Sequence, residues 1–171
     1  MPAYTEHIIA DCHCDTLWHF NNDSYRFTNL NPGQQVDLPR LLEGRVRILF
    51  FAICVAAEIA RPFHFPEALR YIALYLRCLA ENRSIMHGIE TAADLNFSGK
   101  DGSVGCLLAL EGAEPLAGSP ELLDLFYQVG VRSVALTWNK PNRFAYSCAE
   151  NSSRGGLRRA GRKLIGALAK K

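Results

Sequence analysis

The sequence lacks any apolar run long enough to cross a membrane as a helix. Its longest such run covers residues 48–57, whereas a membrane helix needs about 18 apolar residues. It also lacks low-complexity segments. Of its 171 residues, 49% are hydrophobic and 21% are charged. This composition excludes a disordered chain, a collagen and a coiled coil, and we expect a globular protein without a membrane span.

A large net charge is also missing, because 19 basic residues stand against 17 acidic ones. The acidic residues are absent from residues 154–171, however, where seven basic residues gather. We predict a basic amphipathic helix at about 156–171. A solvated helix face explains this pattern better than an anion-binding tail, so no nucleic-acid partner is expected.

A secretory signal is not evident, since the first residues, MPAYTEH, have neither a basic region nor a long apolar run. Three of the six cysteines, Cys54, Cys78 and Cys106, lie inside apolar stretches and are interpreted as small buried hydrophobic residues. We therefore expect free thiols and a cytoplasmic location.

Apolar runs alternate with helical patterns along the chain. Four buried strands are predicted at residues 7–15, 46–55, 103–110 and 131–138, and helices at 37–43, 66–83, 91–95, 119–130 and 156–171. Continuous apolar strands that alternate with helices are typical of parallel sheets covered on both faces. The fold class is therefore α/β, with about four parallel β-α units in a single domain over residues 1–171.

The first strand ends in His13-Cys14-Asp15. Residues i and i+2 of a strand point to the same face, so His13 and Asp15 should project together, with Cys12 and Cys14 on the opposite side. An imidazole and a carboxylate at a strand end make a divalent-metal half-site, although a simple hydrogen-bonded pair fits as well.

The third predicted strand ends in Glu111, directly after a mostly apolar run. A carboxylate in this position is costly unless it is paired or bound to a cation. Because parallel strands place their carboxyl ends on one side of the sheet, Glu111 should converge with His13 and Asp15. The alternative is an ion pair with Arg132 or Lys140.

Three further residues are candidates for substrate binding. Trp138 and Asn139 follow the fourth strand, and His19 follows the first. All three would lie on the side of the sheet where Glu111 is expected. Core packing of Trp138 and an ordinary loop position for Asn139 are the alternatives.

These residues, in this order, resemble the renal or membrane dipeptidases, a family of zinc-dependent hydrolases. The resemblance rests on IIADCHCDTLW (8–18), QVDLPRLLEGRVRILFFAICV (35–55), LLALEGAEPL (107–116) and ELLDLFYQVGVRSVALTWNKPN (121–142), and continues weakly through GGLRRAGRKLIGAL (155–168). It implies a (β/α)₈ TIM barrel that hydrolyses dipeptides with metal-activated water. It also implies His13, Asp15 and Glu111 as zinc ligands.

The chain departs from this family pattern after Glu111. The family's second zinc needs two later histidines, and its acid/base residue is a late Asp, but no histidine follows His87 and Asp124 is the only Asp after Glu111. The chain thus resembles the N-terminal half of the barrel, a truncated form. We expect one zinc site, assign no catalytic residue, and expect the chain alone to hydrolyse dipeptides poorly or not at all.

Two other functions fit the same sequence. One is a catalytically inactive half-barrel that binds one metal ion and forms a homodimer through its open sheet edges. The other is a small α/β module whose basic tail binds an anionic surface. Metal content and peptide hydrolysis separate the first alternative from an enzyme, and salt-dependent binding to anionic surfaces identifies the second.

Overall fold

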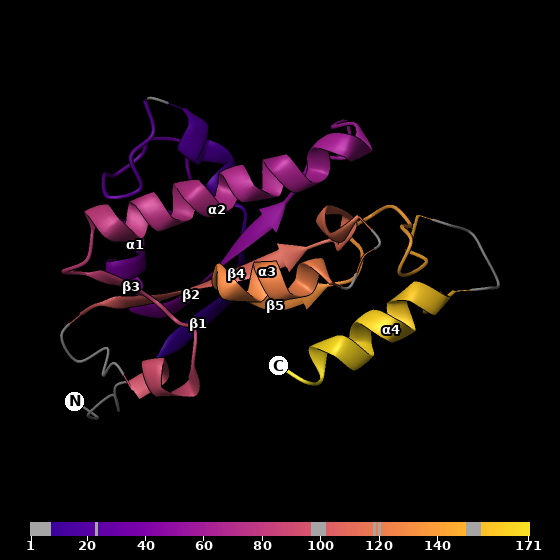
Figure 1. Ribbon diagram of the computed structural model, residues 1–171. Helices are drawn as coiled ribbons and strands as arrows, with labels where there is room; N and C mark the ends of the chain where they lie inside the picture. Colours follow the sequence, from indigo (N-terminus) through magenta and orange to yellow (C-terminus); the bar gives the residue numbers. More distant parts are fainter. Residues whose placement is uncertain (1–7, 23, 97–101, 118, 120, 150–154) are drawn as a thin grey trace. The chain divides into compact units, whose positions relative to one another are not determined.

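The computed structural model describes residues 8–22, 24–96, 102–117, 119, 121–149 and 155–171. The strands are β1 (Ile9–Cys14), β2 (Val46–Cys54), β3 (Met86–Gly88), β4 (Val104–Glu111) and β5 (Val131–Ala135). The α-helices are α1 (Leu38–Glu43), α2 (His64–Glu81), α3 (Leu122–Gln128) and α4 (Arg159–Leu168) (Figure 1). Short 3₁₀ helices cover Thr16–Asn21, Arg61–Phe63, Ala92–Asn96 and Glu114–Leu116.

The chain forms two compact units. The first contains residues 1–51 and 74–107, and the second contains residues 52–73 and 108–171. The interpretation of residues 1–171 as a single domain stays a prediction.

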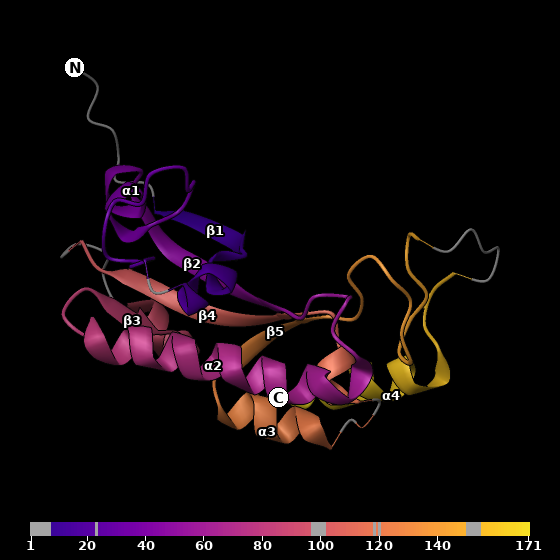
Figure 2. The same ribbon diagram turned by 90° about the horizontal axis from the view of Figure 1, so that it is seen from above.

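The first unit is built on a parallel sheet in the order β1-β2-β4-β3. Figure 2 shows β1 beside β2, its partner in the ladder. Phe51 of β2 is fully buried and packs against Phe27 and Tyr75 with ring centroids 5.5 Å apart. The Tyr75 hydroxyl donates a hydrogen bond of 2.8 Å to the carbonyl of Cys106 in β4, which fastens α2 to the sheet.

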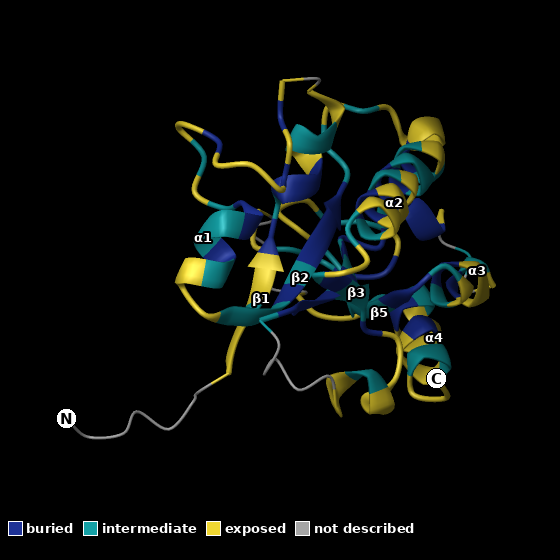
Figure 3. Cartoon of the chain, turned by 90° about the vertical axis from the view of Figure 1, so that its left-hand side faces the viewer, coloured by how far each residue is buried: buried dark blue, intermediate teal, exposed yellow. Residues whose placement is uncertain are grey.

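The prediction that the first strand is buried is wrong. Ile9 is 46% exposed and Ile8, just before β1, is 57% exposed, and Figure 3 shows β1 mostly in the colour of exposed residues. The reason is that β1 is the first strand of the sheet and pairs with β2 alone among the described residues. Apolar residues on such an edge have a neighbour on one side only.

The predicted count of four strands is also wrong, because β3 adds a fifth. This strand pairs with the first residues of β4 through Met86, His87 and Gly88. Three residues are too few to show a periodic pattern, so β3 left no signal in the sequence. The parallel α/β class itself is confirmed.

Asp37 begins α1, as its position before Pro39 predicts. Its Oδ1 accepts a hydrogen bond from the backbone N–H of Arg40 at 3.1 Å, and Gly44 ends the helix. The carboxylate is fully buried, accepts a second bond from the N–H of Asn31 at 2.9 Å, and pairs with the Arg40 guanidinium. One side chain therefore ties the loop before α1 to the helix.

The second unit contains the end of β4, with β5 paired in parallel beside it and α3 packed on β5. The strand β5 ends at Ala135, earlier than the predicted residue 138, and beyond its end the carbonyl of Leu136 accepts a hydrogen bond from the N–H of Ala113 at 3.1 Å. Trp138 and Asn139 therefore lie in the loop that follows.

The basic C-terminal residues take part in internal contacts of this unit. Lys171 pairs with Asp124 of α3 at 2.6 Å, which places the end of α4 against α3 (Figure 2). The Arg158 guanidinium lies 4.2 Å from the ring centre of Tyr146. In α4 itself, Arg159, Arg162 and Lys163 are exposed, as expected for a solvated helix face.

All six cysteines are free thiols, and Cys14, Cys54, Cys78 and Cys106 are buried. Burial raises the pKa of the Cys78 thiol to about 11 and also raises the pKa of Cys14 and Cys106. Buried thiols with a raised pKa are poor nucleophiles, which fits their interpretation as small hydrophobic residues.

Among the described residues, every helix is too short or too polar to cross a membrane.

Candidate metal centre

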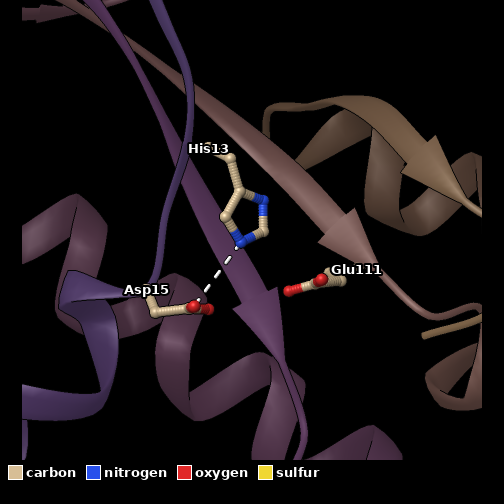
Figure 4. Close-up of side chains that lie close together, drawn as sticks. All are labelled: His13, Asp15 and Glu111. Carbon is tan, nitrogen blue, oxygen red and sulfur yellow. Dashed lines mark ion pairs between the residues drawn. The ribbon is translucent and has the colours of Figure 1, made fainter. Parts of the chain in front are cut away.

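His13 and Asp15 lie together at the carboxyl end of β1, as their i, i+2 spacing predicts. His13 Nε2 is 3.5 Å from Asp15 Oδ2, shown by the dashed line in Figure 4. The pairing register of β1 is irregular between Asp11 and Cys14, and the backbone N–H of His13 donates to Asp11 Oδ1 at 3.1 Å. Cys14 is buried, whereas Cys12 is exposed. The two candidate ligands of the first unit are therefore adjacent.

One oxygen of Asp15 is poorly satisfied. Its Oδ1 is buried and has no hydrogen-bond partner among the described residues, while the Asp15 side chain as a whole is 45% exposed. A buried carboxylate oxygen normally accepts at least one hydrogen bond, because desolvation without compensation is costly. A cation beside Asp15 would satisfy this oxygen, and an imidazole with carboxylates is a donor set that suits a divalent ion.

Glu111 is the last residue of β4, in the second unit. The next residue, Gly112, has a φ of +86°, and a Cβ there would collide with the Glu114 carboxylate and lie 3.7 Å from the backbone nitrogen of Trp138. Glycine is thus required where the chain turns away from the strand. This turn leaves the Glu111 side chain at the strand end.

Arg132, the suggested ion-pair partner of Glu111, makes several contacts with other groups. Arg132 stacks on Tyr127, with 3.9 Å from its guanidinium carbon to the ring centre, and its Nη1 donates to the carbonyls of Tyr127 and Val131 at 2.7 and 3.0 Å. The Arg132 guanidinium is therefore already engaged on the side of α3.

A cavity of about 270 Å³ lies beside Glu111 within the second unit. It is lined by Val55, Ala57, Ile59, Arg61, His64, Glu111, Glu114, Trp138, Lys140 and Pro141. The predicted substrate residue Trp138 thus shares a cavity with Glu111. Sequence reasoning missed Arg61, since nothing in the loop after β2 connects it to β4, and treated Lys140 only as a possible partner of Glu111.

The other two candidate substrate residues lie elsewhere. Asn139 is exposed and not part of this lining, and its carbonyl accepts a hydrogen bond from the Ser147 hydroxyl at 2.6 Å. His19 belongs to the 3₁₀ helix of the first unit and packs on Tyr25, with ring centroids 5.5 Å apart. His64 is buried, with Nε2 2.8 Å from the carbonyl of Ile59, and holds the loop that leads into α2.

The chain is similar to proteins that cleave dipeptides. The family model described as membrane dipeptidase, peptidase family M19, matches residues 2–170. Dipeptidase aclJ of Aspergillus oryzae is 30% identical over 92% of this chain and 41% of its own length. Dipeptidase 3 of Macaca fascicularis is 30% identical over 77% of this chain and 27% of its own length.

Solved structures show the same likeness. The dipeptidase AC, a metallopeptidase of family M19, superposes with a TM-score of 0.83 and 28% identity over 97% of this chain and 54% of its own. A metallopeptidase from Rhodobacter sphaeroides, bound to a phosphinate mimic of L-Ala-D-Ala, gives a TM-score of 0.82 and 26% identity over 95% of this chain and 56% of its own. The chain spans about half the length of these solved chains.

Proposed function

Because this chain belongs to the membrane dipeptidase family, peptidase family M19, we propose that it carries one metal half-site of a dipeptide hydrolase. His13, Asp15 and Glu111 are the ligands, and each offers one ligand atom. The observation that carries the proposal is the buried, unsatisfied Oδ1 of Asp15 beside His13. The proposed ion is zinc, for which one nitrogen and two oxygen ligands leave a position open to substrate.

The topology supports a shared site for the three side chains. All the strand pairs with a described register run parallel, so His13 and Asp15 follow β1 at the same end at which Glu111 follows β4. In the first unit, β2 separates β1 from β4. Two strand spacings amount to about 10 Å, which side chains of this length can bridge when they lean towards the strand between them.

Each residue at such a site has a distinct role. His13 and Asp15 hold the ion from one strand, and Glu111 holds it from another. Trp138, which is 40% exposed, lines the cavity beside Glu111 and offers an apolar surface to a substrate there. A divalent ion bound here supplies Lewis-acid polarisation of a peptide carbonyl and lowers the pKa of a water molecule.

The proposal predicts about one zinc ion per chain and a strong dependence on each carboxylate. We expect Asp15→Asn and Glu111→Gln each to weaken zinc binding about 100-fold, since even the outer partners of ligands are worth about 10- to 100-fold. Glu114→Gln is the matched control, because Glu114 lines the same cavity without belonging to the ligand set. The measurement is competition with a chelator on the purified chain.

Equal zinc affinity of the wild type and the Glu111→Gln variant would contradict the three-residue site. Hydrolysis of L-alanyl-L-alanine is the second readout. We expect weak turnover that Glu111→Gln removes and Glu114→Gln retains, because a half-site lacks the cooperation of the second metal and of a proton-transferring residue.

A second function, self-association, is favoured by one observation, the exposed apolar residues Ile8 and Ile9 at β1, which pairs with β2 alone in the part of the chain that the structure describes. Unpaired strand edges with exposed apolar residues pair readily with another chain. We expect the chain to form dimers that Ile9→Lys disrupts, as measured by light scattering after size exclusion. A wild-type chain that stays monomeric at all concentrations tested would rule this out.

A further inference from the structure

From the cations around the Glu111 cavity, we infer a binding site for a carboxylate group of the substrate, formed by Arg61 and Lys140. Both residues line the cavity of about 270 Å³ beside Glu111. The inference deepens the proposed function and rests on it, because it names the substrate class of the same site: dipeptides whose carboxylate reaches these two cations.

The first support is that both cations are available. The structure shows no ion pair or side-chain hydrogen bond that joins Arg61 or Lys140 to another described residue. They come from different segments, the 3₁₀ helix Arg61–Phe63 and the loop after β5, yet they line one cavity. Two cations at one cavity repel each other, and an anion between them relieves this repulsion.

The second support is the balance of charge. An adjoining cavity of about 320 Å³ shares Arg61, His64, Glu114 and Pro141 with the first and adds Arg143. Without a metal the two linings hold two carboxylates, Glu111 and Glu114, against the three cations Arg61, Lys140 and Arg143. The field in the cavity therefore favours a negatively charged group, which a guanidinium binds through two parallel hydrogen bonds.

The third support is the hydrogen bonding of the loop that contains Lys140. Asn142 donates from Nδ2 to the carbonyl of Leu136 at 2.6 Å, and its Oδ1 accepts from the N–H groups of Phe144 and Ala145 at 2.8 and 3.1 Å. On the opposite segment, His64 fixes Ile59 by its hydrogen bond of 2.8 Å. Both cations thus stand on segments that are anchored by side chains.

The test compares three ligands by isothermal titration calorimetry at low ionic strength. L-Ala-L-Glu has two carboxylates, L-Ala-L-Gln has only the terminal one, and the C-terminal amide of L-Ala-L-Gln has none. Titrations in EDTA measure the carboxylate site alone, without hydrolysis, and titrations with zinc add the metal. We expect each carboxylate that reaches the site to tighten binding up to about fivefold, the upper end of the range for exposed ion pairs.

The variants are Arg61→Gln, Lys140→Gln and the double substitution, with Arg83→Gln as a control of equal charge change. Arg83 is exposed and lies outside both cavities. A preference for L-Ala-L-Glu that is lost in the double variant assigns a side-chain carboxylate to the site. A loss seen only between L-Ala-L-Gln and its amide assigns the terminal carboxylate.

Equal binding of the three ligands, no binding of any of them, or a preference that survives the double variant would overturn the inference. These results are independent of the metal site. A carboxylate preference in EDTA that depends on Arg61, together with absent zinc binding, would reject the proposed function and keep the anion site. Normal zinc binding without the preference would do the reverse.

Discussion

Replacement of Asp37 by Ala is expected to lower the free energy of unfolding by about 2–4 kcal/mol, the sum of a lost N-cap bond of about 1 kcal/mol and an unsatisfied buried N–H group of about 1–3 kcal/mol. The substitution removes the acceptor of two backbone N–H groups, those of Asn31 and Arg40, and the partner of the Arg40 guanidinium. The carboxylate is fully buried, so water cannot replace these bonds without opening the loop. Urea unfolding of the purified chain measures the change.

Two further variants define the source of this loss. Asp37→Asn keeps an acceptor for the N-cap bond and is expected to cost less than Asp37→Ala. Asp94→Ala removes a carboxylate that accepts bonds from the N–H groups of Glu90 and Thr91 at the surface, and its effect should be much smaller. A loss below about 1 kcal/mol for Asp37→Ala would show that the buried network is dispensable, since one N-cap bond alone is worth that much.

Gly161→Ala is expected to destabilise the chain by about 2–3 kcal/mol, the cost of overpacking a close contact. A Cβ at this position in α4 would collide with the backbone carbonyl of Phe144. That carbonyl also accepts a hydrogen bond from the N–H of Arg158 at 2.8 Å. The helix therefore cannot shift without losing its start and exposing Phe144 and Leu164, which are 1% and 0% exposed.

The same helix offers the control. A Cβ added at Gly166 would meet no described atom within 4 Å beyond the neighbouring backbone of its own helix. Gly166→Ala should therefore raise stability by up to about 1 kcal/mol through helix propensity alone. Opposite signs for the two substitutions in urea unfolding are the expected result. Similar effects at both positions would mean that α4 does not pack closely on Phe144.

The sequence alone determined the parallel α/β class and most of its elements. A continuous apolar run predicted β2, and apolar residues at helical spacing predicted α2, because nine strand residues or five turns of helix are long enough for the pattern to be recognised. The start and end of α1 were predictable from the local sequence, since Asp37 and Gly44 form hydrogen bonds with backbone groups a few residues away. The pair His13 and Asp15 was also predictable, because strand geometry relates residues two apart.

Tertiary structure alone decided which residues are covered and which side chains share a space. The apolar residues of β1 look like those of a buried strand, but their exposure depends on whether a second strand pairs with them. Arg61 and Lys140 line one cavity with Glu111 although they belong to different loops. Such neighbours are set by the path of whole segments through space, and a local sequence pattern records only the forces between residues that are close along the chain.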